Sequence, residues 1–239
     1  MDTTYKFREM IEFRDQFTRE IGAKLIVHTN TAAIESGANP YTLGTEKCCG
    51  LLKTQALLDG LREGGFDAAF GGARRDEEKS RAKERIYSFR DKFGQWDPKN
   101  QRPELWNLYN GRINKGETIR VFPLSNWTEA DVWQYIEEEK IPVVPMYFAK
   151  PREMVVRGKS LIAIEHNPHL LPGEKTETVM SRMRSLGCSH CTGAIRSEAD
   201  TLPKIIDELI TFRRSERENR VIDHDREGSM ELKKREGYF

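Results

Sequence analysis

The chain has no long apolar run and almost no net charge. No stretch of its 239 residues approaches the roughly 20 apolar residues of a membrane-spanning helix, and the first six residues contain no apolar signal region. The formal net charge is +1, from 39 basic and 38 acidic side chains. We therefore expect a cytoplasmic protein that is neither a general nucleic-acid binder nor a membrane binder, and any anion site must be local.

Glycine is missing from the start of the chain, where the first one is Gly22. A nucleotide-binding α/β domain normally opens with a strand and a glycine-rich phosphate loop. Here the apolar spacing of residues 5–21 predicts a helix instead, with Gly22 as its stop. We expect that the phosphate loop is absent from this sequence.

Cysteine is also scarce, and its four positions are Cys48, Cys49, Cys188 and Cys191. In a cytosolic chain such cysteines are more often reduced, metal-binding or redox-active than disulfide-bonded. The Cys-Cys pair and the Cys-x-x-Cys motif could together give four thiolates to a [4Fe–4S] cluster or a zinc ion. The alternative is buried reduced thiols with a chance Cys-x-x-Cys, because that motif alone is a weak signal.

Pairs of helices and strands in the first half predict an α/β fold with a parallel sheet. A short buried strand is predicted at residues 24–28, and a helix at 51–61 leads to a second strand at 66–70. Each strand ends where a loop begins, which is where open α/β sheets bind ligands.

The second half predicts further elements around a long loop. The apolar residues of 93–118 follow neither helical nor strand spacing, but the aromatic residues among them favour an ordered loop. The elements expected after it are a strand at 119–124, a helix at 128–139 with a Thr128–Asp131 capping box, a hairpin over 153–164 that turns at Arg157-Gly158, and a helix at 203–212. Residues 213–239 are highly charged and predict a tail that is disordered or ordered by a partner.

The most informative stretch covers residues 66–81, where a short strand ends at Gly71-Gly72 and a block of cationic side chains follows. Glycines let backbone N–H groups approach a ligand closely, and arginine and lysine suit phosphate or sulfate. The alternative is a turn followed by a solvated, salt-bridged helix. The junction of strand, glycines and Arg74-Arg75 favours an oxyanion site.

Four stretches resemble a known enzyme family, and they are residues 66–85, 96–106, 121–129 and 228–239. They closely resemble the small, catalytic subunits of bacterial sulfate adenylyltransferases, and the likeness covers nearly the whole chain. The resemblance implies an adenine-nucleotide α-hydrolase-like (Rossmann-like) α/β fold that is N-terminally truncated and carries a C-terminal extension. We expect a partial α/β domain over residues 1–145. We expect an extension over 146–239 with the hairpin, the Cys-x-x-Cys motif and a partner-binding tail.

The activity implied by the resemblance joins sulfate to the α-phosphate of ATP, with Mg²⁺, giving adenylyl sulfate and pyrophosphate for cysteine synthesis. A GTP-hydrolysing large subunit is the implied partner. Preoriented cations and backbone N–H groups would hold the two anions. The residues predicted for this site are Arg74, Arg75 and Asp76 as catalytic groups, with Gly71, Gly72, Lys79 and Arg81 as nucleotide-binding groups. Asp76 and Glu77 could orient the arginines or hold Mg²⁺ indirectly.

Two departures from the family pattern keep other interpretations open. The Ser-Gly-Gly-x-Asp-Ser loop that binds ATP in this family is missing, so the chain as written is expected to bind ATP poorly. The cysteines are also similar to the cluster-binding pattern of adenylylsulfate reductases, but no cysteine follows Cys191 to act as the nucleophile. The alternatives are an Fe–S sulfonucleotide reductase and a truncated, non-catalytic interaction subunit.

Overall fold

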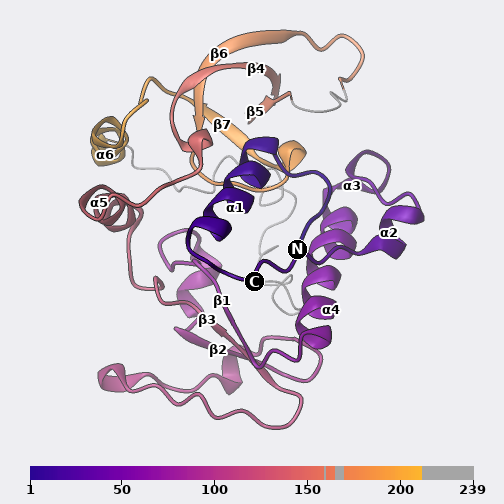
Figure 1. The fold of residues 1–239 in the computed structure, drawn as a ribbon, viewed down its shortest axis with the longest axis vertical. Coiled ribbons are helices and arrows are strands. Elements are labelled where there is room, and N and C mark those ends of the chain that lie inside the picture. Colours follow the sequence, from indigo (N-terminus) through magenta and orange to yellow (C-terminus); the bar gives the residue numbers. More distant parts are fainter. Residues whose placement is uncertain (159, 165–169, 212–239) are drawn as a thin grey trace.

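The computed structural model describes residues 1–158, 160–164 and 170–211, and it shows an α/β protein with two separate sheets (Figure 1). The first sheet has the strand order β1 (Ala68–Phe70), β3 (Thr118–Val121) and β2 (Tyr87–Arg90). β1 and β3 run parallel, whereas β2 is antiparallel to β3, in place of the all-parallel sheet predicted from strands at 24–28 and 66–70. The α/β class is confirmed, and the sheet is mixed.

The helices that precede this sheet in the chain come from its first 63 residues. They are α1 (Arg8–Glu20), α2 (Thr31–Glu35), α3 (Pro40–Cys49), the π-helical η1 (Gly50–Gln55) and α4 (Ala56–Glu63). The helix predicted at 51–61 is present, but it belongs to a longer helical run that begins at Pro40. Asn39 caps that run by accepting the backbone N–H groups of Tyr41 and Thr42, and Pro40 suits the first helical position.

The strand predicted at residues 24–28 is wrong. This segment has no regular secondary structure and pairs with no strand, and Leu25, Ile26 and Val27 are 41%, 56% and 46% exposed. A strand needs a neighbour for its N–H and C=O groups, and no described residue supplies a ladder here. At the end of the segment, the carbonyl of His28 accepts a hydrogen bond from the backbone N–H of Asp2 at 2.7 Å.

The second sheet is a closed antiparallel barrel in the order β4-β5-β7-β6, at the top of Figure 1. Its strands are β4 (Lys150–Arg157), β5 (Ser160–Ala163), β6 (Thr176–Met183) and β7 (Gly193–Arg196). The predicted hairpin is confirmed as β4–β5, and Gly158 has the positive φ of +58° that its turn requires. Phe7, at the start of α1, is buried in the barrel core with Met146, Met154 and Met183.

Two further helices, α5 (Glu129–Glu138) and α6 (Leu202–Thr211), pack against each other through Trp133 and Ile205. The predicted Thr128–Asp131 capping box is present at the start of α5. Short 3₁₀ turns complete the fold: η2 (Lys79–Lys83), η3 (Pro98–Asn100), η4 (Leu105–Asn107), η5 (Pro145–Tyr147) and η6 (Ser189–Cys191).

Two expectations stay predictions. The division of the chain at residue 145 is one of them, and the partner-binding tail lies outside the described residues. Within the part that the structure describes, no helix is both long enough and apolar enough to cross a membrane.

Candidate anion-binding site

The candidate site begins where β1 ends, at Gly71 and Gly72. The N–H of Gly71 continues the pairing with β3 by donating to the carbonyl of Val121 at 2.9 Å. Gly72 is exposed, and the place where a side chain would begin is open space. The turn therefore starts at the carboxyl ends of β1 and β3, where open α/β sheets bind ligands.

Glu77 joins two of the predicted arginines in this turn. Its Oε1 accepts the backbone N–H of Arg74 at 3.1 Å and lies 3.7 Å from Nη1 of the same residue. Its Oε2 lies 3.2 Å from Nε of Arg81. All three side chains are buried, so one carboxylate serves two guanidinium groups.

A second carboxylate, Glu84, connects the turn to the sheet. Its backbone carbonyl accepts a hydrogen bond from Nε of Arg75 at 3.2 Å. Its Oε1 accepts two more, from Nη2 of Arg90 at 2.9 Å and from the hydroxyl of Ser88 at 3.0 Å. Burial lowers the pKa of Arg90 below its ordinary value, although Glu84 opposes the shift. Arg90, 1% exposed, thus extends the cationic region onto the face of β2.

Arg120 adds a fourth buried guanidinium group. It lies opposite Ser88 across the β2–β3 pair and shares the sheet face of Arg90. Burial, together with the nearby charge of Arg90, lowers the pKa of Arg120 to about 10. We call Arg74, Arg81, Arg90 and Arg120 the arginine cluster. All four guanidinium groups are buried, and ion pairs join Arg74 and Arg81 to Glu77 and Arg90 to Glu84.

Sequence reasoning missed Arg90 and Arg120. Each lies inside a short strand, where a charged residue is usually expected to point to solvent. A signal was available: Arg120 stands between Ile119 and Val121, in a segment predicted to be buried. What the sequence did not give is the register that puts both arginines on one face.

Asp76 has a different position from the arginines. Its Oδ2 accepts the N–H of Glu129, the first residue of α5, at 3.1 Å. The Glu129 carboxylate in turn pairs with Arg184, just after β6. Asp76 therefore fixes the turn to α5 and, through Glu129, to the end of the barrel strand, while its catalytic role stays a prediction. The backbone of Lys79 begins η2, and its side chain lies outside the described part.

The cysteines gather away from this turn, and all four are buried and reduced. Cys49, Cys188 and Cys191 pack together with Tyr5. Burial, followed by the neighbouring thiols, raises the pKa of Cys48 to about 11. A hydrogen bond with Cys49 and then burial raise the pKa of Cys191.

Among the described residues, no group of three or more histidine, cysteine or acidic side chains has the arrangement of a metal site. The thiols as placed form a buried, packed cluster. A metal or Fe–S cluster on them stays a prediction without geometric support.

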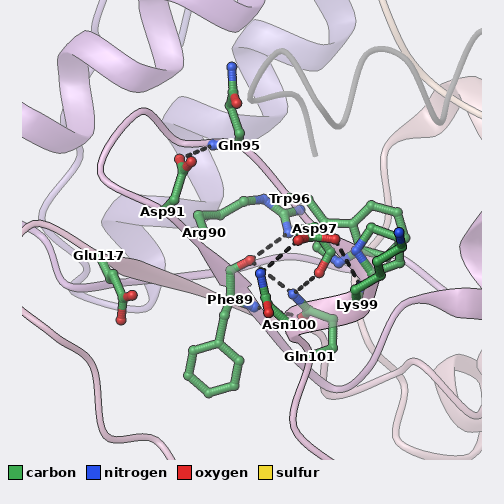
Figure 2. Close-up of a pocket in the computed structure, with 11 residues that line it drawn as sticks. Phe89, Arg90, Asp91, Gln95, Trp96, Asp97, Lys99, Asn100, Gln101 and Glu117 are labelled. Carbon is green, nitrogen blue, oxygen red and sulfur yellow. Dashed lines mark hydrogen bonds between the residues drawn. The ribbon is translucent and has the colours of Figure 1, made fainter.

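A cleft of about 600 Å³ lies beside the end of β2 and is lined by Phe89, Arg90, residues 95–101 and Glu117 (Figure 2). The register pairs Arg90 with Thr118, the first residue of β3, whereas β3 ends at Val121. The cleft therefore opens at the amino end of the parallel strands. Ligands of such sheets bind at the opposite edge, so we place the candidate site at the turn after β1.

Comparison with known proteins gives the family. A model of the phosphoadenosine phosphosulfate reductase domain matches residues 1–194. Sulfate adenylyltransferase subunit 2 of Saccharophagus degradans is 61% identical over the whole of this chain and 79% of its own length. The subunits 2 of Myxococcus xanthus and Yersinia pestis are 58% and 59% identical, again over the whole chain and over 79% and 80% of their lengths. The chain belongs to the sulfate adenylyltransferase subunit 2 family.

Membership of this family confirms the resemblance seen in the sequence. It also favours the transferase interpretation over the reductase one, because relatives about 60% identical over the whole of this chain carry the transferase name, while the reductase name belongs to the shared domain. Of the predicted site residues, the structure brings Arg74 and Arg81 together on Glu77. It places the cysteines in a separate cluster.

Proposed function

We propose that this chain is the catalytic subunit of a sulfate adenylyltransferase, which joins sulfate to the α-phosphate of ATP and releases pyrophosphate. Family membership supports the reaction class. The observation that carries the proposal is the pairing of two buried arginines, Arg74 and Arg81, with the Glu77 carboxylate directly after the Gly71-Gly72 turn. Positioned guanidinium groups at the carboxyl edge of β1 and β3 suit an oxyanion.

The chemistry requires two anions to be held close together. A sulfate oxygen attacks the α-phosphorus and forms the new P–O bond, while the bond from phosphorus to the bridging oxygen breaks and pyrophosphate leaves with that electron pair. Fixed guanidinium groups lower the repulsion between sulfate and ATP and stabilise the charge on the leaving group. We assign anion contact first to Arg74 and Arg75, then to Lys79 and Arg81, with the backbone at Gly71-Gly72 lining the approach.

Mg²⁺ is implied by ATP chemistry, but the carboxylates of this turn do not fit as its direct ligands. Asp76 already accepts the N–H of Glu129, and Glu77 already bridges Arg74 and Arg81. The geometry of Glu77 supports an orienting role toward the arginines, and that of Asp76 supports a role in holding the turn against α5, so we derive no step through the ion.

A partner subunit is part of this proposal, because the relatives carry the name subunit 2. We propose that the partner is a GTP-hydrolysing large subunit that drives the unfavourable adenylyl transfer. The four reduced thiols suit a cytoplasmic location for this assembly.

Sulfate-dependent exchange between ATP and pyrophosphate tests the proposal, with this chain and the large subunit combined. For Arg74→Ala we expect exchange at least about 100-fold slower, the usual effect of removing one positioned charge-stabilising donor. Arg74→Lys should recover part of the rate, because it keeps the charge but not the fork of donors. Arg19→Ala, at an exposed position in α1, is the control and should match wild type.

Two outcomes would contradict the proposal. Unchanged exchange by Arg74→Ala would remove the assigned anion contact. A wild-type chain that binds the large subunit without any exchange would support the non-catalytic interaction subunit instead.

A further inference from the structure

The loops that follow β1 and β3 are hydrogen-bonded to each other at the carboxyl edge of the sheet. The N–H of Gly71 donates to the carbonyl of Val121 at 2.9 Å. Further along the two loops, the N–H of Arg75 donates to the carbonyl of Ser125 at 2.9 Å, and Ser125 is 3% exposed. The turn that carries Arg74 and Arg75 is therefore placed by the loop after β3 as well as by its own residues.

A third hydrogen bond joins the same turn to α5. Oδ2 of Asp76, which directly follows Arg75, accepts the N–H of Glu129 at 3.1 Å. Glu129 is the first residue of α5, and the N–H groups of a first helical turn have no partner inside the helix. The positive end of the helix dipole also favours a carboxylate at this place. The position of the turn therefore depends on the position of α5.

Glu129 is held in turn by Arg184, which lies just after β6. Nε of Arg184 donates to Oε1 of Glu129 at 3.3 Å, and Nη2 donates to Oε2. The two side chains are 4% and 12% exposed, so the pair is almost completely removed from water. A guanidinium group that binds a carboxylate through two bonds fixes its orientation as well as its position. Arg184 thus connects the end of a barrel strand to the first turn of α5.

We propose that Arg184 is a positioning residue for the anion-binding turn and acts through Glu129 and Asp76. The inference rests on the proposed function, which supplies the reaction. The guanidinium group of Arg184 orients the carboxylate of Glu129, and the backbone of Glu129 binds Asp76. Asp76 lies between Arg75 and Glu77 in the chain, so a shift of Asp76 moves the turn. Such a shift slows the reaction even though every cation is still present, because anion transfer depends on how the cations are placed.

A second ion pair in the same segment separates positioning from stability. Arg182 is 0% exposed and pairs with Glu208 of α6 at 2.6 Å. Replacing either Arg182 or Arg184 by Met removes a buried cation from its carboxylate partner, so both variants should be destabilised. Of the two carboxylates, it is Glu129 whose backbone binds the turn. Arg182→Met is therefore the matched control.

Sulfate-dependent exchange between ATP and pyrophosphate, with this chain and the large subunit combined, tests the inference at a temperature where the variants are folded by circular dichroism. We expect kcat to fall at least about tenfold in Arg184→Met and to stay at the wild-type value in Arg182→Met. Arg184→Lys should recover part of the rate, because it keeps the charge beside Glu129. Adding Asp76→Asn to Arg184→Met should cost less than the product of the two separate effects, since both changes act on the same turn.

Glu129→Gln carries the same test if Arg184→Met does not fold. It keeps the shape of the side chain and the N–H that binds Asp76, and it weakens the pair with Arg184. We expect the same fall in kcat, of at least about tenfold.

The outcomes separate the inference from the proposed function. Wild-type kcat in the folded Arg184→Met or Glu129→Gln variant, while Arg74→Ala slows exchange, would overturn the inference alone. Equal falls in Arg182→Met and Arg184→Met would also overturn it, because a general loss of structure would then explain both. Absence of exchange in the wild-type complex would overturn the proposed function, and the inference with it.

Discussion

Glu77 is the residue on which the geometry of the proposed anion site depends most. It accepts the backbone N–H of Arg74 and pairs with the side chains of both Arg74 and Arg81, all in buried positions. The sequence shows the arginines and suggests that an acidic neighbour orients them. It does not show that a single carboxylate holds two of them, because that depends on how the turn folds back.

Replacing Glu77 by Gln should destabilise the folded protein, because Arg74 and Arg81 lose the carboxylate that they share. We expect a loss of about 3 kcal/mol in the free energy of unfolding, because removal of one partner leaves buried charge unpaired. The loss should be smaller in sodium sulfate than in sodium chloride of equal ionic strength, since a bound oxyanion replaces part of the missing negative charge. Urea denaturation measures both values, and Glu138→Gln, exposed on α5, is the control.

Equal losses in the two salts would contradict the expectation. They would mean that sulfate does not enter the space beside the arginines. The stability change would then report a purely structural ion pair.

At the scale of elements, the sequence predicted caps and turns correctly, but it did not predict how the strands pair. The capping box at Thr128 and the β4–β5 turn at Gly158 are decided by neighbouring residues, and both are confirmed. The strand at 24–28 failed because its apolar residues find no partner strand in the described fold. The barrel was not predicted beyond its first hairpin, because its closure depends on β6 pairing with both β4 and β7.

The contact between α1 and the barrel gives a prediction about pH. Glu9 of α1 lies 2.8 Å from Lys150 and 2.9 Å from Arg152, both in β4. Burial raises the pKa of Glu9, but hydrogen bonds and charge from Lys150 and Arg152 outweigh it, so the pKa lies below its ordinary value of 4.5. Because the folded state binds this proton less readily, Glu9 contributes stability above pH 4.5 that is lost as the pH falls through its lowered pKa.

Glu9→Gln should therefore lower the free energy of unfolding by about 1 kcal/mol at pH 7, and by progressively less below pH 4.5. Melting curves between pH 3 and 7 check this. Glu12→Gln, in the same helix with both partners of its ion pair well exposed, should change little at either end. A difference between wild type and Glu9→Gln that stays constant down to pH 3 would contradict the assigned pKa shift.

At the scale of the whole molecule, a net charge of +1 does not reveal that Arg74, Arg81, Arg90 and Arg120 are buried. Composition suggested that any anion site must be local, and the junction of strand, glycines and arginines suggested a site after Gly71-Gly72, which stays a prediction. The fold then adds Arg90 and Arg120 from a strand pair, which sequence spacing alone does not bring to the turn. The arginine cluster is therefore a product of the mixed sheet and of the basic block together.

Titration of the chain with sulfate, followed by calorimetry, tests the central claim most directly. We expect one saturable site that is weakened at least about tenfold by Arg74→Ala and unaffected by Arg19→Ala, with selenate competing and chloride of equal ionic strength not competing. Saturable binding that is identical in wild type and Arg74→Ala would contradict the account, as would sulfate heats that disappear in chloride of equal ionic strength.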